Sequence, residues 1–309
     1  MNPLTHLKKT RILRNIFLSL GAIFVLVTAA YAQNLYVSAN RPQSLGGHAI
    51  LEFTPSGVQS TYATGLDNPR GLTFDSTFSN LFAAHNPGKF AIKRGPNVIG
   101  TVLKFDLQNH VSTVGSAVNF VFEGLAVDMA GNAYVMAQDL NSPTLASTIF
   151  KFTPDGERIV FGSVPGQGFG LAFDSAGNLF AADVGDQTIF KFTTDGTRTV
   201  FAGPSAFTGG AAPIGLAFDS AGNLYVSTVG NPGSDTILEF TPTGVESTFA
   251  TGLTNPKGLA FDSLGHLFVA EANAIPDGDI LEFAPDGSEL PVFASGFGRP
   301  EFLTFGPPR

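Results

Sequence analysis

The chain has 309 residues, of which 43% are hydrophobic and 14% are charged, with a formal net charge of −8. This balance is that of a globular protein and excludes a largely disordered chain. There is no cysteine, which excludes disulfides, thiolate metal sites, a thiol nucleophile and a lipid-modified N-terminal Cys. Phe is unusually frequent, with 30 copies against 5 Tyr and no Trp, and this bias indicates one packing position that recurs many times.

The first 32 residues differ from the rest and predict a signal peptide. A basic stretch comes first, with Lys8, Lys9, Arg11 and Arg14. An apolar run follows at 16–30, and Ala30-Tyr31-Ala32 has the small-x-small pattern of a cleavage site. The run is short for a membrane-spanning helix, which needs about 20 residues. We expect cleavage after Ala32, a periplasmic or secreted protein with no membrane association, and a single domain over 33–309.

Removal of residues 1–32 leaves 13 Lys and Arg against 25 Asp and Glu, a formal charge of −12. Nucleic acids are bound mainly through clustered Lys and Arg. We therefore expect neither nucleic acid nor an anionic membrane surface as a partner.

One string recurs unchanged at 170–178 and 215–223, where both segments read Gly-Leu-Ala-Phe-Asp-Ser-Ala-Gly-Asn. Related copies begin at Gly71, Gly124, Gly258 and Phe302, so that successive copies start 43 to 53 residues apart. This period is close to that of a four-stranded propeller blade. The six copies predict an all-β, six-bladed β-propeller.

Each repeat predicts four antiparallel strands. The first is Gly-Leu-x-Phe, and an Asp-Ser-x-Gly-Asn hairpin turn leads to the second, as at 178–182. The third is an Ile/Leu-x-Phe run such as 189–192, followed by a Thr-Pro-x-Gly turn and the fourth strand. No helix is expected after residue 32. The hairpin turn also explains its Asp, because the segment lacks the alternating oxygen ligands of a calcium loop.

The two ends of residues 33–309 complement each other. Residues 34–40 read as a second strand with no first strand before it, and residues 302–305 read as a first strand with no second strand after it. We expect them to pair and to complete blade one from both ends of the chain, which removes the open edges of a linear array.

The Phe bias predicts an aromatic packing layer between adjacent blades. The third strands each supply one Phe, namely Phe53, Phe105, Phe152, Phe192, Phe240 and Phe283. The second strands supply Tyr36, Phe82, Tyr134, Phe180, Tyr225 and Phe268. Large aromatic side chains each bury about 150–250 Å², so these residues are expected to hold the blades together.

The pattern Pro-x-Gly-Leu-Ala-Phe-Asp-x-x-Gly-Asn/His-Leu-Tyr/Phe-Val at 213–226 and 256–269 resembles the NHL repeat. NHL propellers are similar to the six-bladed TolB-like group, which includes the gluconolactonase and senescence-marker family of metal-dependent lactonases. The resemblance implies the fold. It leaves the function open, because such propellers include scaffolds, ligand binders and enzymes.

The expected topology places all irregular insertions on one rim, here called the loop rim. These insertions are 86–100, 138–147, 203–213 and 272–278. Long loops on a rigid scaffold usually carry function. The residue before each Gly-Leu-x-Phe is expected at the mouth of the central channel on this rim. Around the ring this column reads Glu301, Arg70, Glu123, Phe169, Ile214 and Lys257.

Two interpretations of the column stay open. The four charged residues Arg70, Glu123, Lys257 and Glu301 form a salt-bridge cluster that seals the channel, or they hold a small polar ligand. If neither ligand nor partner binds there, the candidate site becomes the blade-two insertion around Lys89, Lys93 and Arg94.

A second set on the loop rim consists of His85, Asp183 and Glu271, at the ends of second strands. These residue types can bind a divalent metal such as calcium, but alternate blades of a six-fold ring are far apart. In the lactonases that the chain resembles, metal ligands occupy the pre-glycine column. Only Glu301 and Glu123 offer an oxygen ligand there, and Phe302 stands where that pattern has Gly.

The expected function is an exported, monomeric binding or scaffold module for an unidentified small ligand, glycan or protein. We expect no cofactor and assign no catalytic residue. The alternatives are a metal-dependent hydrolase of the gluconolactonase type, with a divalent metal as its cofactor, and a related propeller lyase.

Overall fold

The structure is a computed structural model and describes residues 33–41, 47–87, 98–144, 146–230, 235–272 and 278–307. The predicted signal peptide at 1–32 lies outside these ranges. Residues 31–309 group into one compact unit. In the ranges given above, no helix is long and apolar enough to span a membrane.

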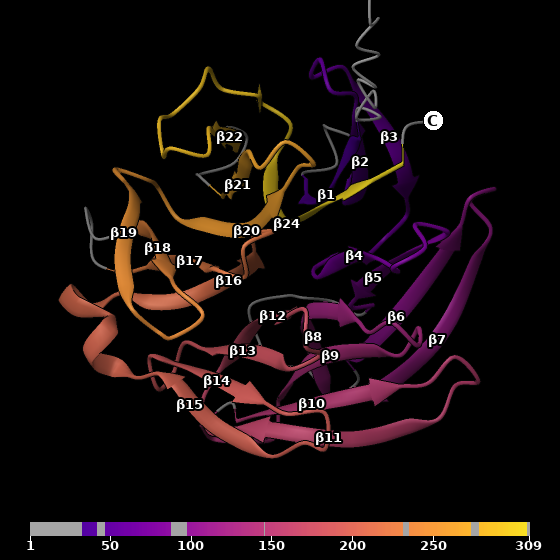
Figure 1. The fold of residues 1–309 in the computed structure, drawn as a ribbon. Coiled ribbons are helices and arrows are strands. Elements are labelled where there is room, and N and C mark those ends of the chain that lie inside the picture. The colour runs from indigo at the N-terminus through magenta and orange to yellow at the C-terminus, as the bar shows by residue number, and fades with distance from the viewer. Residues whose placement is uncertain are drawn as a thin grey trace, which may run out of the picture. The chain divides into compact units, whose positions relative to one another are not determined.

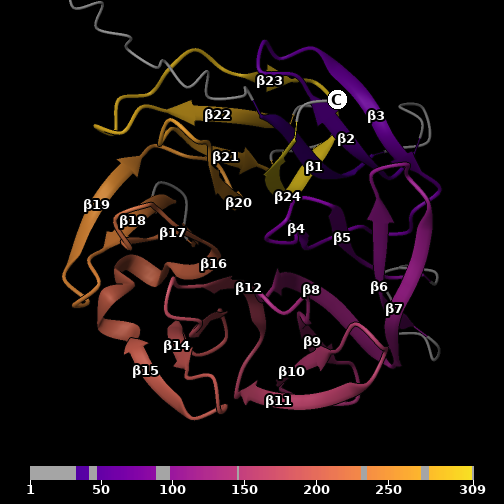
Figure 2. The same cartoon turned by 45° about the vertical axis from the view of Figure 1, so that its right-hand side comes forward.

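The described residues form six antiparallel sheets of four strands each, arranged as a ring around one axis (Figures 1 and 2). From the axis outward, blade one contains β24 (Arg299–Gly306), β1 (Asn34–Asn40), β2 (Ala49–Phe53) and β3 (Gln59–Thr64). Blade two contains β4 (Leu72–Phe74), β5 (Asn80–His85), β6 (Ile99–Asp106) and β7 (Val111–Val118). Blade three contains β8 (Phe120–Val127), β9 (Ala133–Asp139), β10 (Ser147–Phe152) and β11 (Arg158–Val164).

The remaining blades repeat this order. Blade four contains β12 (Gly168–Phe173), β13 (Leu179–Asp183), β14 (Thr188–Phe192) and β15 (Arg198–Ala202). Blade five contains β16 (Ala212–Phe218), β17 (Leu224–Val229), β18 (Thr236–Phe240) and β19 (Glu246–Thr251). Blade six contains β20 (Pro256–Phe261), β21 (Leu267–Glu271), β22 (Asp279–Phe283) and a short β23 (Ala294–Ser295). The predicted six-bladed propeller is confirmed.

One prediction is wrong in detail, because two single 3₁₀ turns follow residue 32. They are η2 (Pro204–Ala206) and η3 (Thr208–Gly210), and both lie in the 203–213 insertion. Pro204 stands at the start of η2, where its fixed φ suits a helical turn and its missing N–H costs no hydrogen bond. A single 3₁₀ turn is too short to produce a periodic apolar pattern, so the sequence gives no signal for either of them.

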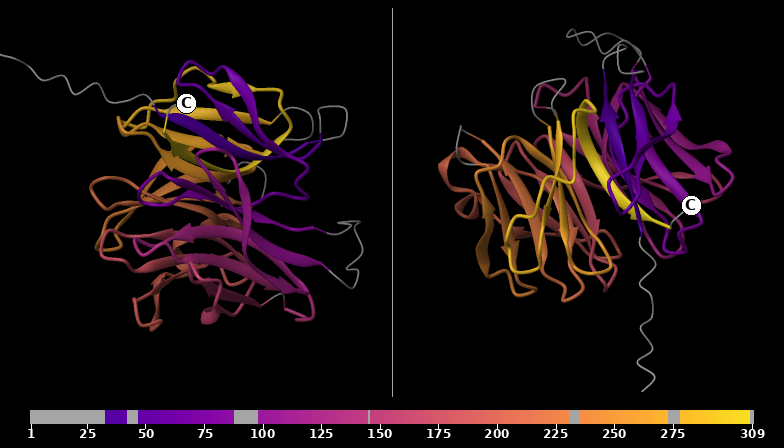
Figure 3. Two further views of the ribbon diagram at one scale, coloured as in Figure 1. Left: turned by 90° about the vertical axis from the view of Figure 1, so that its right-hand side faces the viewer. Right: turned by 90° about the horizontal axis from the view of Figure 1, so that it is seen from above.

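The predicted closure of blade one is confirmed. Strand β1 pairs antiparallel with β24, with Leu35 opposite Phe305 and Val37 opposite Leu303. The two strands come from opposite ends of the described chain and lie side by side (Figure 3). Strand β24 also extends beyond the predicted 302–305, to Arg299 on one side and Gly306 on the other.

The glycine that begins most repeats is explained by the close approach of neighbouring inner strands. The Gly71 N–H donates to the carbonyl of Glu123 in the next blade at 2.8 Å. A Cβ atom added to Gly71 would collide with that carbonyl, and one added to Gly215 would collide with the carbonyl of Lys257. Side chains are therefore excluded at these points of the ring.

We expect Gly215→Ala to destabilise the protein by about 1–3 kcal/mol, the usual range for forcing extra carbon into a packed site. Urea unfolding measures this loss. Gly203→Ala is the matched control, because its added Cβ would meet only the Val200 side chain at 3.9 Å. A Gly215→Ala protein as stable as the Gly203→Ala protein would contradict the close approach.

The predicted aromatic layer is also confirmed. The twelve aromatic residues assigned to the second and third strands are between 1% and 6% exposed. In one example, the Phe192 ring of blade four packs beside Phe161 of blade three, with ring centroids 6.0 Å apart. A Cβ atom on Gly162 would touch the same Phe192 ring. The third-strand Phe therefore fills space left by a glycine in the neighbouring blade.

The Asp residue in each of these hairpin turns is explained by the hydrogen bonds that its carboxylate accepts within the turn. In the turn after β12, Asp174 Oδ1 accepts from the N–H groups of Ala176 and Asn178, and Oδ2 accepts from the Asn178 side chain. The turn after β16 repeats this arrangement at Asp219. These carboxylates stabilise the turns, as an Asx motif does.

Candidate functional site

The structure brings three of the four charged column residues into direct contact. Arg70 precedes β4, Glu123 lies in β8 and Glu301 lies in β24. Arg70 Nη1 donates to Glu301 Oε2 at 2.6 Å, and Arg70 Nε lies 3.5 Å from Glu123 Oε2. Since the inner strands of the blades converge on the axis, residues at the same repeat position meet there. Arg70 therefore lies between two residues of opposite charge, Glu123 and Glu301, as the order of the column predicts.

Lys257, the fourth charged residue, has a different environment. Its Nζ lies 5.6 Å from the centre of the Phe169 ring, which also belongs to the column. No described residue forms an ion pair or a hydrogen bond with this ammonium group. Its backbone is fixed, because the Lys257 carbonyl accepts from Ser227 Oγ at 2.6 Å. The site therefore contains a positioned cation that lacks an anionic partner among the described residues.

Three residues that were not predicted complete the group. Asn40 Nδ2 donates to Glu301 Oε1 at 3.0 Å and to Asn68 Oδ1 at 3.1 Å. Arg299 Nε lies 3.4 Å from Glu301 Oε1. Asn40 and Arg299 face each other in the β1–β24 pairing, so the composite blade places both at the channel mouth. We call the full set, Asn40, Asn68, Arg70, Glu123, Lys257, Arg299 and Glu301, the mouth cluster.

The mouth cluster holds most of the unsatisfied buried polar atoms of the described residues. Those without a hydrogen-bond partner are Asn40 Oδ1, Arg41 Nε, Asn68 Nδ2, Arg70 Nε, Asn109 Oδ1, Glu123 Oε2 and Arg299 Nε. Only Arg41, which follows Asn40, and Asn109 fall outside the cluster. Buried polar groups in folded proteins nearly always have a partner. Such a concentration at one place therefore calls for an explanation.

Burial and the charges of neighbouring residues shift the pKa values of residues in the mouth cluster. Burial raises the pKa of Glu123, and the positive charge of Arg70 only partly opposes this. Burial also lowers the pKa of Lys257, although Glu301 acts in the other direction. For Arg70, burial works to lower the pKa, but Glu123 and Glu301 outweigh it and raise that pKa above its ordinary value. The low-dielectric surroundings thus move the titration of Glu123 to higher pH.

The raised pKa of Glu123 predicts a pH-dependent contribution to stability. The folded protein binds a proton here more tightly than the unfolded chain, so this contribution is present at low pH and is lost as pH rises above the ordinary Glu value of 4.5. Arg70, Lys257, Arg299 and Glu301 all influence this group. We expect the melting temperature of the wild type, relative to Glu123→Gln, to fall between pH 4.5 and pH 7.

Thermal melts of both proteins across this range test the expectation. The comparison removes the titration of all other groups, which the two proteins share. A difference that stays constant, or that grows in favour of the wild type as pH rises, would contradict a raised pKa at Glu123.

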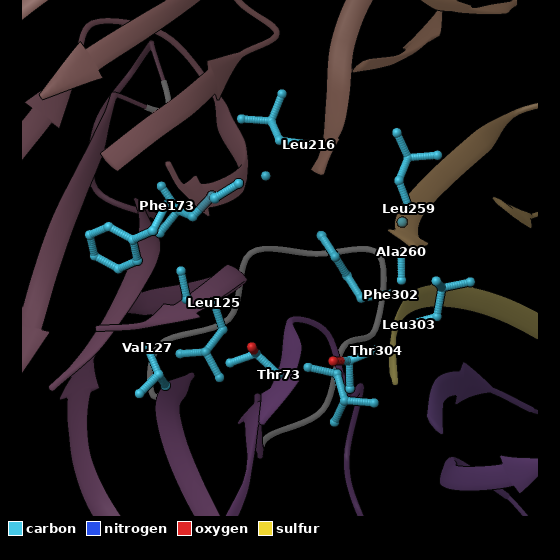
Figure 4. Close-up of a pocket in the computed structure, with 16 residues that line it drawn as sticks. Thr73, Leu125, Val127, Phe173, Leu216, Leu259, Ala260, Phe302, Leu303 and Thr304 are labelled. Atoms are coloured by element: carbon cyan, nitrogen blue, oxygen red, sulfur yellow. The ribbon is translucent and has the colours of Figure 1, made fainter. Parts of the chain in front are cut away.

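A cavity with both polar and apolar surface lies next to the mouth cluster inside the channel. It has a volume of about 220 Å³. Each blade contributes one leucine to its lining, namely Leu72, Leu125, Leu171, Leu216, Leu259 and Leu303. Four of them, Leu125, Leu216, Leu259 and Leu303, are labelled in Figure 4. Thr73 and Thr304 add hydroxyl groups. Gly170, Gly258 and Phe302 also line it, and these directly follow column residues. The cluster and the cavity are therefore adjacent.

Phe302 is a departure from the repeat that affects this channel. It occupies the position at which the other repeats have Gly, and its side chain packs against the buried group between blades one and two that includes Tyr36 and Leu72. The same residue lines the cavity. The aromatic ring thus adds apolar surface where the other blades have none.

The structure does not bring His85, Asp183 and Glu271 together as one site. Each accepts a hydrogen bond from the backbone of the loop that enters its own blade. The pairs are His85 Nδ1 with Asp67 N–H at 3.1 Å, Asp183 Oδ2 with Gly166 N–H at 2.9 Å, and Glu271 Oε1 with Thr254 N–H at 2.5 Å. In the described part of the chain, no group of three or more His, Cys, Asp or Glu is arranged to hold a metal.

The donor set of the column does not fit a hard cation. Calcium prefers about six oxygen ligands, whereas Phe169, Ile214 and Lys257 offer none from their side chains. The two Glu301 oxygens already accept from Arg70 and Asn40.

The alternative site in the blade-two insertion cannot be described in the same way, because Lys89, Lys93 and Arg94 lie outside the described residues.

No protein-family model matches the chain, and no curated protein matches it. Solved structures do match. TolB from Acinetobacter baumannii has a TM-score of 0.66 at 9% identity, over 90% of this chain and 68% of that one. Virginiamycin B lyase from Staphylococcus aureus has a TM-score of 0.58 at 14% identity, over 90% and 92% of the two chains.

A putative gluconolactonase has a TM-score of 0.54 at 17% identity, over 82% of this chain and 85% of that one. Identities this low carry information on fold rather than on activity. They agree with the TolB-like resemblance of the repeats and with the ring of six four-stranded sheets. The chain is a six-bladed β-propeller, distantly similar to TolB-like and gluconolactonase-like propellers.

Proposed function

We propose that the protein is an exported binding module that holds a small polar ligand at the mouth of its central channel. The observation that carries the proposal is the concentration in the mouth cluster of buried polar atoms that have no hydrogen-bond partner. In this proposal residues 1–32 are a signal peptide, and the mature protein works as a monomer.

The alternative of a sealing salt-bridge cluster accounts for the contacts less well. A cluster that serves only to close a channel stabilises the fold most when every charge is neutralised and every polar atom has a hydrogen bond. Leaving a buried donor or acceptor without a partner costs about 1–3 kcal/mol. Here Lys257 lacks an anion, and Arg70 Nε and Glu123 Oε2 are 3.5 Å apart without a hydrogen bond. A bound ligand would satisfy such groups.

Binding is favoured over metal-dependent hydrolysis for a specific reason. The lactonase chemistry that the resemblance implies requires oxygen ligands around the channel, and three column positions carry Phe169, Ile214 and Lys257. Only Glu123 retains an oxygen without a hydrogen-bond partner in the column. Metal analysis of the purified protein, together with a lactone-hydrolysis assay, tests this alternative directly.

A thermal-shift screen of small carboxylates, phosphates and neutral sugars tests the proposal. A ligand that binds only the folded state raises its stability in proportion to the logarithm of ligand concentration over Kd. We expect at least one compound to stabilise the wild type. Arg70→Gln and Glu301→Gln should each remove that stabilisation, because losing one charged partner typically costs about 2–5 kcal/mol of affinity.

Arg158→Gln and Glu246→Gln are matched controls, since both residues are exposed on outer strands. They should bind as the wild type does. If instead Arg70→Gln and Glu301→Gln fold normally and keep full binding, the mouth cluster is a sealing cluster, and the candidate site moves to the insertion at 86–100.

A further inference from the structure

We infer that a pocket between blades five and six is a second binding site, which takes an alkylammonium group from a small amine or from a lysine side chain. The two blades are neighbours in the ring (Figure 2). The pocket lies among their hairpin turns, on the rim opposite the loop rim, and is separate from the mouth cluster. Its lining, the equivalent places in other blades and the local charge support the inference.

Aromatic rings and carboxylates line this pocket, which has a volume of about 390 Å³. The rings are Tyr225 and Phe249 of blade five and Phe261 of blade six. The Tyr225 centroid lies 5.0 Å from that of Phe249 and 4.8 Å from that of Phe261. Asp219 and Asp262 contribute one carboxylate from each blade. Carboxylates and the faces of aromatic rings both attract cations.

In blade three, a lysine of the chain itself occupies the equivalent place. Lys151 lies directly across from Tyr134 in the β9–β10 pairing, and its Nζ is 5.4 Å from the centre of the Tyr134 ring. The Tyr134 hydroxyl donates to the turn residue Asp128 at 3.3 Å. Tyr225 follows Asp219 by six residues, as Tyr134 follows Asp128. The two blades therefore share the ring and the turn carboxylate.

Blade four repeats the arrangement of blade three. Lys191 lies across from Phe180, with its Nζ 5.2 Å from the ring centre and 3.6 Å from Asp174 Oδ2. An ammonium group is thus bound by an aromatic ring and a turn carboxylate in this blade as well.

Blade five has a glutamate where blades three and four have this lysine. Glu239 lies directly across from Tyr225 in the β17–β18 pairing. Burial raises the pKa of Tyr225, and the carboxylates of Glu239 and Asp219 raise it further. At Tyr134 burial also raises the pKa, but Lys151 opposes that rise. Blade five therefore keeps the ring and the turn carboxylate and has an anion in place of the cation.

This part of the chain has almost no cation of its own. Residues 199–298 contain 11 Asp and Glu, and Lys257 of the mouth cluster is their one Lys or Arg. His266 Nδ1 lies 3.5 Å from Asp262 Oδ2, whereas the hydrogen bonds that Asp219 accepts within its turn come from neutral N–H groups. The charge of the pocket thus favours a cationic ligand from outside the chain.

The lining favours an organic ammonium over a metal ion. Divalent metals such as calcium require several oxygen ligands. In the described part of the chain, no group of three or more His, Cys, Asp or Glu is arranged to hold one. The apolar stem of an alkylammonium would instead pack against the rings and against Leu264 and Pro285, which also line the pocket. A volume of this size suits a small organic molecule.

Isothermal titration calorimetry with butylammonium tests this inference. We expect it to bind at least about tenfold more tightly than 1-butanol or butyrate, because only the ammonium group is attracted by the rings and the carboxylates. Nα-acetyl-lysine N-methylamide is the second probe. If it binds at least as tightly as butylammonium, the pocket accepts a lysine side chain of a protein. If it binds more weakly, the ligand is a small amine. Either result supports an ammonium site.

Glu239→Lys should weaken butylammonium binding by at least about tenfold, because the new side chain brings its own ammonium group to the Tyr225 ring. The fold should tolerate this change, since Lys151 occupies the equivalent position of blade three. Glu246→Lys is the matched control, with the same change of charge in the same blade. Glu246 lies across from Phe240 in the β18–β19 pairing, which places it on the other face of the sheet from Glu239. Its affinity should stay within about twofold of the wild type, because salt screens distant charges.

Circular dichroism shows whether both variants are folded. If Glu239→Lys does not fold, Glu239→Gln takes its place and should weaken binding by about threefold or more. The inference is overturned if 1-butanol binds as tightly as butylammonium, if the folded Glu239 variant keeps the wild-type affinity, or if neither amine binds. The mouth cluster lies on the other rim, so such a failure would leave the proposed function standing.

Discussion

Deletion of residues 300–309 is expected to abolish the cooperative unfolding transition of the protein. The deletion removes nearly all of β24, which forms the inner strand of blade one and pairs with β1 along its length. Leu303 and Phe305 are 4% and 8% exposed, so the deletion also opens the core between blades six and one. The ring then has two free edges, which expose unpaired backbone groups and favour aggregation.

Size-exclusion chromatography and thermal melts measure this effect. Deletion of residues 307–309 is the matched control, because it leaves β24 intact and should keep the wild-type melting temperature within a few degrees. If the longer deletion stays monomeric and melts as the wild type does, the closure of blade one by β24 does not hold the ring together.

Phe192→Ala and Phe240→Ala are each expected to cost about 3–5 kcal/mol of unfolding free energy. Both rings are 1% exposed. Phe192 packs against blade three, and Phe240 lies between Phe201 and Phe207 at centroid distances of 5.8 Å and 6.3 Å. An alanine would leave a cavity that the rigid strands cannot fill. Domains of this kind are usually stable by only about 5–15 kcal/mol, so the loss would be a large fraction.

Urea unfolding with a linear extrapolation gives these values. Val200→Ala is the control, because Val200 is 61% exposed on the outer strand β15 and surface substitutions usually change stability by less than about 0.5 kcal/mol. Losses under 1 kcal/mol at both Phe positions would place the rings outside the core between blades.

The fold was predictable from the sequence because the same pattern of strands and turns occurs in most of the blades. Strand order, turn type and the aromatic layer each recur in most blades. An irregular copy, such as the one that begins at Gly71, can therefore be recognised by comparison with the regular copies. Blade one is the harder case, since its first and second strands lie at opposite ends of the chain. Its closure followed from counting strands, and the structure confirms it.

The mouth cluster was predictable only in part. Arg70, Glu123 and Glu301 meet because they share one repeat position at the axis. Asn40 and Arg299 were missed, because their meeting depends on the register of β1 against β24, and that pairing shifts by a bulge between Ser38 and Ala39. A repeat alignment contains no information on such a shift.

Lys257 was expected to meet Arg70, Glu123 and Glu301 at the channel mouth, but its Nζ lies 5.6 Å from the centre of the Phe169 ring and forms no ion pair with a described residue. The physical reason is competition, because Arg70 and Asn40 already occupy both oxygens of Glu301. The preference of an acid for one of several nearby cations depends on side-chain geometry, which the order of residues does not reveal.

The location of the ligand is tested most directly by a crystal structure of the protein with the compound that gives the largest thermal shift. We expect electron density for that compound at the channel mouth, in contact with Lys257 and Arg70. Density at the blade-two insertion beside Lys89, Lys93 and Arg94, with the mouth cluster unchanged and without ligand, would contradict it.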